Sequence, residues 1–157
     1  MIMLTFTTDK QAKQMIEVKF YETVYEPDTK LTYSVISARF RNKWIFVRHN
    51  KRTTYEIAGG HIEPGESSHE AACRELMEET GAVQFSLECI ATYSVKKDGV
   101  TGWGRLYFAE VTELGPLPEM SEIGEVIFGM ELPEKNTHPD IQPYLFKKTL
   151  EYLNAGE

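Results

Sequence analysis

The first half of the chain alternates apolar and polar residues in short runs, which is typical of half-buried strands. These runs predict strands over residues 16–25, 31–40, 43–49 and 55–58. Pro27-Asp28 marks a turn, and Arg41-Asn42 is short enough to join the second and third strands as a hairpin.

The second half continues with strand patterns and ends with helical spacing. Residues 83–97 predict a long strand with an irregularity, and Asp98-Gly99 predicts a hairpin loop after it. Further strands are predicted over 105–111 and 126–130, separated by a polar loop, and a helix is predicted over 140–154. Strands on both sides of one helix, with a terminal helix after them, predict an α/β or α+β sandwich.

The segment between the two halves, GHIEPGESSHEAACRELMEETGA (residues 60–82), predicts a loop followed by a helix. Ser67 and Ser68 are alternative N-caps, and Gly81 is suited to a left-handed C-terminal position. Helical periodicity places three glutamates on one face, with Ala71 and Ala72 in the same arc: Glu75, Glu78 and Glu79. Cys73, Leu76 and Met77 fall on the far side, so we expect that side to face the core and the carboxylates to face away from it.

The three carboxylates suggest a metal site. Like charges on one face destabilise an isolated helix, so a bound cation would account for them. Their hard oxygen atoms suit Mg²⁺ or Mn²⁺. The alternative is a solvated acidic face on an ordinary surface helix, and the flanking glycines and Glu66 at fixed offsets favour the metal site.

The whole pattern resembles the signature of the Nudix hydrolases, in particular MutT-like members. It is carried by Gly60, Glu66, Arg74, Glu75, Leu76, Glu78, Glu79 and Gly81. The chain departs from the family at Ala82, where a bulky aliphatic residue is usual, and at Ala58, where many relatives have proline. The resemblance implies a single Nudix domain over residues 1–157, folded as an α/β/α sandwich with a mixed sheet and a loop–helix–loop signature.

The resemblance also implies a set of site residues. Glu75, Glu78 and Glu79 correspond to the metal ligands, with the backbone carbonyl of Gly59 as a further ligand. Either Glu75 or Glu79 serves as general base, and the sequence leaves both open. Arg74 lies one turn before Glu78 and is expected to orient it by a charge-assisted hydrogen bond, the alternative being a plain surface pair.

Two acidic residues outside the helix complete the implied site. Glu66 is expected to brace the signature loop or a further metal. Related enzymes often add a distant acidic residue from a loop after the helix, and we choose Glu122 over Glu119 and Glu125 because of its place just before the strand at 126–130. A solvated loop charge is the alternative for each.

Substrate-binding residues are less specific. Arg48 and Arg52, with Lys51 between them, cluster before the signature and are candidates for phosphate binding, against the alternative of a solvated loop. Trp103, between Gly102 and Gly104, is the best exposed candidate for stacking on a base. Other aromatic residues are expected in the core more often than at the substrate: Tyr33, Phe46, Tyr55 and Tyr107.

Composition narrows the partners. The chain has 157 residues, 41% of them hydrophobic and 26% charged, as in a soluble globular domain. Its net charge of −7 argues against nonspecific binding to duplex nucleic acid. Cys73 and Cys89 give neither a disulfide framework nor metal-ligand spacing. No apolar run approaches membrane-spanning length and the start lacks a signal-peptide pattern, so we expect no membrane partner and a cytoplasmic location.

The leading functional hypothesis is a metal-dependent hydrolase that cleaves a nucleoside diphosphate linked to another group. Within that class we favour a nucleoside triphosphate pyrophosphohydrolase that yields a nucleoside monophosphate and pyrophosphate, with oxidised purine nucleotides among its candidate substrates. Nucleotide sugars, dinucleoside polyphosphates and capped RNA are alternatives of the same chemistry. A nucleotide sensor without activity is the alternative of a different class. The sequence leaves open whether the chain is a monomer or a homodimer.

Overall fold

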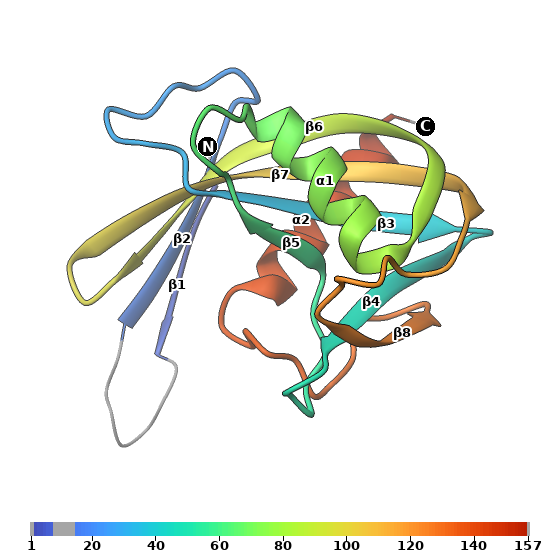
Figure 1. Cartoon of the computed structure of the whole chain (residues 1–157). Helices are drawn as coiled ribbons and strands as arrows, with labels where there is room; N and C mark the ends of the chain where they lie inside the picture. Colours follow the sequence, from blue (N-terminus) through green and yellow to red (C-terminus); the bar gives the residue numbers. More distant parts are fainter. Residues whose placement is uncertain (1, 8–14, 157) are drawn as a thin grey trace.

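A computed structural model describes residues 2–7 and 15–156 of the chain, with side chains from residue 15 onwards. Two helices and eight strands form this part of the molecule (Figure 1). The strands are β1 (Ile2–Thr7), β2 (Met15–Tyr21), β3 (Tyr33–Phe40), β4 (Lys43–His49), β5 (Ala58–His61), β6 (Ala82–Lys97), β7 (Val100–Leu114) and β8 (Ile123–Gly129). The helices are α1 (Ser68–Thr80) and α2 (Gln142–Ala155). Neither of these two helices is long and apolar enough to cross a membrane.

The strands form one mixed sheet in the order β1-β2-β6-β7-β3-β4-β8. The pairing of β3 with β7 is parallel and the other pairings are antiparallel. Two strands share one side of β3, because β5 pairs with residues 33–36 and β4 pairs only with residues 39–40. Strands β4 and β5 therefore diverge from one edge of β3, and the signature helix begins after β5.

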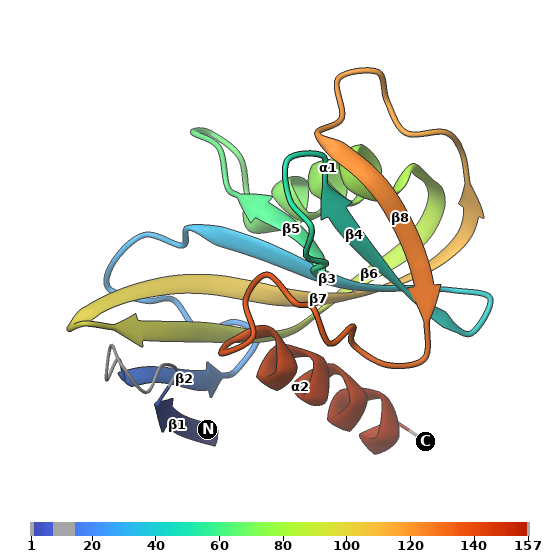
Figure 2. The same ribbon diagram turned by 90° about the horizontal axis from the view of Figure 1, so that it is seen from below.

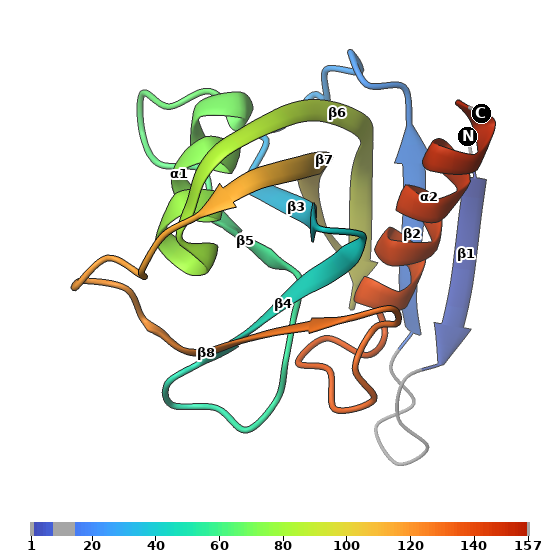
Figure 3. The same cartoon turned by 90° about the vertical axis from the view of Figure 1, so that its right-hand side faces the viewer.

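The sheet lies between the two helices, with α1 on one face and α2 on the other (Figures 2 and 3). Each helix covers its own apolar cluster. The α1 cluster includes Ile36, Ile45 and Leu76, and the α2 cluster includes Phe46, Leu106 and Leu145. The predicted α/β/α sandwich with a mixed sheet is confirmed.

A buried hydroxyl pair joins α2 to the middle of the sheet. The Oγ of Ser37 lies 2.7 Å from the Oγ1 of Thr149, and both side chains are buried. Thr149 also donates to the carbonyl of Leu145 within α2, so its hydroxyl has partners on both sides. Buried polar groups need such partners, because an unmet hydrogen bond in the core is costly.

Most predicted elements are present, with some displaced ends. The two-residue turns at Arg41-Asn42 and Asp98-Gly99 are confirmed, and all four residues have positive φ, as twisted hairpins require. The irregularity in β6 is also confirmed, as register shifts along its pairing with β7. The alternation did not predict β1, which pairs with β2 at the edge of the sheet.

The strand predicted at 55–58 lies instead at 58–61. Tyr55 and Glu56 form only isolated bridges, whereas Gly59 and Gly60 pair with β3. A Cβ on Gly59 would stand 2.6 Å from the carbonyl oxygen of Ser34, so only glycine allows the two backbones to approach so closely. The glycine pair therefore belongs to a strand and is not the turn that its composition suggests.

The buried face of α1 differs from the predicted one. Ala71 and Ala72 are fully buried and Glu79 is 7% exposed, whereas Met77 is 48% exposed. The prediction is confirmed for Leu76, which is fully buried, and for Glu78, which is exposed, but it is wrong for Met77 and Glu79. The helix packs through Leu76 and its alanines, and the small size of the alanines lets its backbone approach β3 and β5 closely.

The glycine after α1 provides a test of the fold. Gly81 (φ 78°) and Gly65 (φ 81°) share a left-handed backbone, but a Cβ on Gly81 would lie 2.4 Å from the carbonyl oxygen of Gly115, and one on Gly65 would contact nothing within 4 Å. We expect Gly65→Ala to lower the free energy of unfolding by about 1 kcal/mol, from backbone strain alone. Gly81→Ala should lower it by about 3 kcal/mol, because the collision adds to that strain. Equal losses in urea unfolding would contradict this difference.

Candidate active site

The loop before α1 is held by Arg74. The guanidinium donates from Nε to Oε2 of Glu66 at 2.7 Å and from Nη2 to Oε1 of Glu66 at 2.9 Å. Nη2 also donates to the carbonyl of His61 at 3.0 Å, and Glu66 accepts the backbone N–H of Glu63. These hydrogen bonds, from Arg74 first, lower the pKa of Glu66 to about 2. Glu66 thus braces the signature loop, one of the two roles expected of it.

The start of α1 fixes the helix relative to this loop. Ser67 is the N-cap and forms a capping box with Glu70, so one of the two predicted cap residues is confirmed. The helix ends at Gly81, whose N–H donates to the carbonyl of Met77. These two caps fix the ends of the helix and therefore the backbone positions of the three signature glutamates.

Arg74 also reaches two of these glutamates. Its Nη1 lies 2.7 Å from Oε1 of Glu75 and 3.4 Å from Oε2 of Glu78. The closest partners of Arg74 are therefore Glu66 and Glu75, and its contact with Glu78 is the longest of the three. The expected hydrogen bond from Arg74 to Glu78 is therefore present, but Arg74 binds Glu66 and Glu75 more closely.

Glu79 lies deepest of the three. Its Oε1 accepts the N–H of Gly59 at 2.9 Å, and its Oε2 lies 3.4 Å from Nε2 of His49. Burial raises the pKa of Glu79 to about 8, partly opposed by the Gly59 hydrogen bond, and the neighbouring carboxylate of Glu75 adds to the rise. Burial also raises the pKa of Glu75, against the effect of Arg74. Burial therefore disfavours the charged form of both carboxylates, more strongly at Glu79 than at the partly buried Glu75.

The donor set fits a hard divalent cation. A cation would balance the charge of Glu75 and Glu79, and carboxylate oxygens are the ligands that Mg²⁺ and Mn²⁺ prefer. Gly60 makes room for this arrangement, because a Cβ there would stand 2.6 Å from the carboxyl group of Glu75. As they are oriented, no three acidic, histidine or cysteine side chains among residues 15–156 are grouped closely enough to hold an ion. The Glu78 side chain is 50% exposed, so it can turn toward the other two without disturbing the core.

A further acidic residue, Glu56, belongs to the same region and was missed in the sequence. It is 7% exposed, and its carboxylate lies 2.9 Å from Nη1 of Arg52, 3.8 Å from Nε2 of His49 and 3.9 Å from Nε2 of His138. Its negative charge contributes to the raised pKa of Glu79. The only sequence signal was a charged residue inside an apolar run, between Tyr55 and Ile57.

Glu122 lies on a loop that is fastened to the end of α1. The Ser121 hydroxyl donates to the carbonyl of Glu78 at 2.7 Å, and the carbonyl of Glu122 accepts the N–H of Asn50 at 2.8 Å. The side chain of Glu122 is exposed. The structure therefore holds the backbone of Glu122 next to Asn50, on a loop that Ser121 fastens to the last turn of α1.

The predicted substrate-binding residues are divided among different surroundings. Arg48 pairs with Glu125 at 3.3 Å and donates to the carbonyls of His49 and Arg52, so it holds loop 50–54 together. Trp103 is partly buried, with its ring 5.1 Å from that of Tyr21 and 5.6 Å from that of Tyr25. Arg52 pairs with Glu56, and His49 lies between Glu56 and Glu79. Of Arg48, Arg52 and Trp103, Arg52 is therefore the residue that is linked to the signature glutamates.

A cavity of about 630 Å³ opens on the other side of the signature loop. Its lining includes Lys30, Glu66, His69, Arg105 and Tyr107. Arg105 is held there by Glu26, by the carbonyl of Tyr25 and by the hydroxyls of Ser68 and Thr92. None of the three signature glutamates Glu75, Glu78 and Glu79 lines this cavity.

Comparison with known proteins agrees with this geometry. A family model described as the NUDIX domain matches residues 29–147. The chain is 32% identical over 119 residues to a Bacillus subtilis (strain 168) protein named "Putative 8-oxo-dGTP diphosphatase YtkD", covering 76% of this chain and 73% of that protein.

Solved structures give the same result. A mutant of the Bacillus subtilis pyrophosphohydrolase BsRppH superposes with a TM-score of 0.74 at 28% identity, covering 94% of this chain and 96% of that one. The NUDIX domain of Shewanella oneidensis NrtR, in complex with ADP ribose, has a TM-score of 0.62 at 16% identity, covering 83% and 94%. This last likeness shows the fold alone.

The raised pKa of Glu79 predicts a pH dependence of stability in chelator. The folded protein keeps a proton on Glu79 up to a pH of about 8, whereas the unfolded chain loses it near 4.5. Folding therefore binds a proton in this window, and the contribution of Glu79 makes the protein less stable as the pH rises from 4.5 to 8. We expect Glu79→Gln, which does not titrate, to lose less stability over this range in thermal melts. Identical slopes for the two proteins would contradict the assignment.

Proposed function

The chain belongs to the Nudix hydrolase family and is a pyrophosphohydrolase of that family, and we propose that it cleaves nucleoside triphosphates with the help of Mg²⁺ or Mn²⁺. The products would be a nucleoside monophosphate and pyrophosphate. The observation that carries this proposal is the set of carboxylates at Glu75, Glu78 and Glu79, of which Glu79 is buried, Glu75 is partly buried and both have a raised pKa. We also infer that residues 1–157 form one domain, because β1 and β2 pair into the same sheet as the matched range.

Each protein group has a proposed role in this reaction. Glu75, Glu78 and Glu79, with the carbonyl of Gly59, would hold the cation. When bound, the cation supplies neutralisation of phosphate oxygens and activation of water. Glu75 or Glu79 accepts the proton of the attacking water, and both carboxylates are held in place, one by Arg74 and the other by Gly59 and His49.

The relatives support the choice of substrate. The name of the Bacillus subtilis relative places 8-oxo-dGTP first among the compounds to assay, followed by the unmodified triphosphates. The neighbour named as a pyrophosphohydrolase is consistent with release of pyrophosphate. The exposed Glu122 has no role in this proposal beyond anchoring its loop through its backbone.

The proposal is tested by assaying a panel of nucleotides with Mg²⁺ or Mn²⁺ and identifying the first products. We expect pyrophosphate and a nucleoside monophosphate from a triphosphate, and loss of turnover in excess chelator. Glu78→Gln and Glu79→Gln should lower kcat by roughly a hundredfold or more. Orthophosphate as the first product, or full turnover in chelator, would contradict the proposal.

Gly60 gives a second test, because its missing side chain makes room for Glu75. Gly60→Ala would place a Cβ 2.6 Å from the carboxyl carbon of Glu75 and push the carboxylate out of position. We expect weaker binding of Mn²⁺, measured by paramagnetic resonance, together with a lower kcat. Gly129→Ala is the matched control, since the nearest atom to its Cβ, the carbonyl oxygen of Glu131, is 3.7 Å away. Unchanged Mn²⁺ affinity in Gly60→Ala would show that Glu75 does not need this space.

A further inference from the structure

The buried carboxylate of Glu56 gathers nitrogen-bearing side chains from three segments of the chain. Arg52 comes from the loop after β4, His49 from the end of β4, and His138 from the segment before α2. Two of these side chains reach the surface, since the side chains of Arg52 and His138 are 48% and 47% exposed, while Glu56 is buried. The buried carboxylate of Glu56 thus holds Arg52 and His138 in place, and these two side chains carry N–H donors at the surface.

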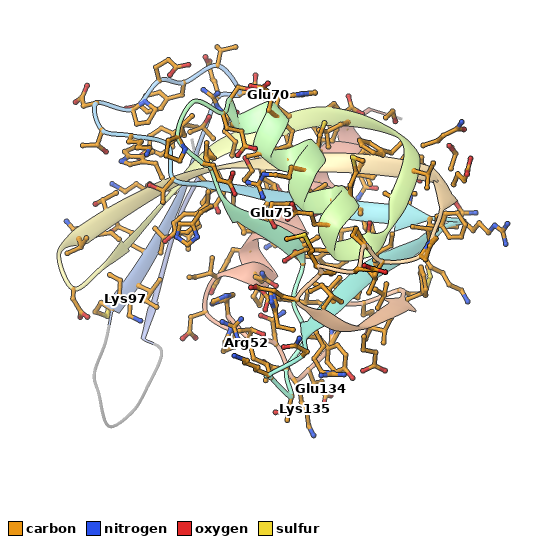
Figure 4. The ribbon with its side chains drawn as sticks, in the orientation of Figure 1. Arg52, Glu70, Glu75, Lys97, Glu134 and Lys135 are labelled. Carbon is orange, nitrogen blue, oxygen red and sulfur yellow. The ribbon has the colours of Figure 1, made fainter. Side chains whose placement is uncertain are left out.

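This group adjoins the carboxylates that we assign to the cation. Nε2 of His49 stands between Glu56 and Glu79, at 3.8 Å from one carboxylate and 3.4 Å from the other. The imidazole ring of His49 therefore lies between Glu56, which holds Arg52 and His138, and Glu79. In Figure 4, Arg52 lies below Glu75, with Lys135 beyond it at the lower end of the molecule.

The segments that carry the donors are themselves fixed. The N–H of Tyr55 donates to the carbonyl of Lys135 at 2.7 Å, and the N–H of Thr137 donates to the carbonyl of Tyr55 at 2.9 Å. The N–H of His138 is held by Oδ1 of Asn136, whose Nδ2 donates to the buried Gln142. The loop of Arg52 and the segment of His138 are therefore tied to each other by backbone hydrogen bonds that do not involve either side chain.

We propose that Arg52 and His138, aligned by Glu56, bind the outer phosphates of the substrate and so select a nucleoside triphosphate over a diphosphate. The inference rests on the proposed function, because it takes the cation site as the place where the inner phosphates lie. A guanidinium suits this role, since it binds phosphate oxygens with several N–H groups in a fixed plane. Arg52 is bound to Glu56 through Nη1, and its side chain is 48% exposed, so part of the guanidinium faces solvent.

Besides the carboxylate of Glu56, positive side chains act on His138. Its pKa is lowered, first by burial, and the positive charges of Arg52 and Lys97 act in the same direction against the opposing effect of Glu56. Positive groups therefore come near His138 from two further elements. The geometry requires no charge on the imidazole, because a neutral ring can still donate an N–H to a phosphate oxygen.

The alternative is that Arg52 and His138 only tie two loops to Glu56. The two interpretations differ in what they predict for the length of the phosphate chain. A purely structural tie would affect substrates with two and three phosphates equally, whereas a binding site for the outer phosphates would affect the triphosphate alone.

The test uses Arg52→Gln and His138→Ala, with Lys147→Gln on the exposed side of α2 as a control for the change in charge. Each protein is titrated calorimetrically with inorganic tripolyphosphate in Mg²⁺ buffer, and kinetics are measured on matched nucleoside triphosphates and diphosphates. We expect each site variant to weaken tripolyphosphate binding and to raise KM for the triphosphate by about tenfold, with kcat and KM for the diphosphate near those of the control.

Two results would overturn the inference. One is tripolyphosphate affinity in both site variants equal to that of Lys147→Gln, and the other is an equal rise in KM for both substrates. If the wild type hydrolysed no nucleotide, the proposed function would fail, but tripolyphosphate binding would still decide whether these residues form a phosphate site. Thermal melts of all variants identify any that are unfolded; Arg52→Lys, which keeps the charge but loses the planar fork of N–H groups, then replaces Arg52→Gln, and His138→Gln replaces His138→Ala.

Discussion

The close approach of the β5 backbone to α1 and β3 is the constraint on which the site depends. Gly59 and Gly60 have carbonyl and carboxylate oxygens within 2.6 Å of where a side chain would begin. This approach lets the N–H of Gly59 reach Glu79 and leaves space for the carboxyl group of Glu75. Larger residues at these two positions would separate the strand from the helix and move both carboxylates.

The same approach creates an electrostatic problem. Bringing Glu79 within reach of Gly59 buries it among Glu75, Glu56 and Glu78, and burial alone already disfavours its charge. The protein supplies partial compensation through Arg74 and His49, while Arg74 gives its two shortest bonds to Glu66 and Glu75. The charge that is still uncompensated is what a divalent cation would balance. The metal-free fold therefore carries a cost that the proposed ligand would remove.

The sequence predicted the parts of this arrangement that follow a local rule. Alternation located most strands, and the cap residues Ser67 and Gly81 located the ends of α1. Helical spacing placed the three glutamates in one arc, but it did not foresee that Glu79 is buried while Glu78 is exposed, and it assigned Met77 to the buried face because it ranked residues by apolarity. Close packing chose small residues instead, and Glu79 was buried with them. The predictions for Arg48 and Trp103 failed to foresee their partners Glu125 and Tyr25, since such contacts join segments far apart in the chain.

Glu56 shows most clearly what a single sequence cannot reveal. Its neighbours come from β4, from the loop after it and from the segment before α2, so nothing in the local spacing links them. Burying an unpaired carboxylate would destabilise the fold, and three nitrogen-bearing side chains offset this effect at Glu56. Those partners sit at one side of Glu79 while Arg74 lies beside Glu75. The carboxylates that suit a cation are therefore flanked by two groups of N–H donors, an order of charges that matches a cation bound to a chain of phosphates.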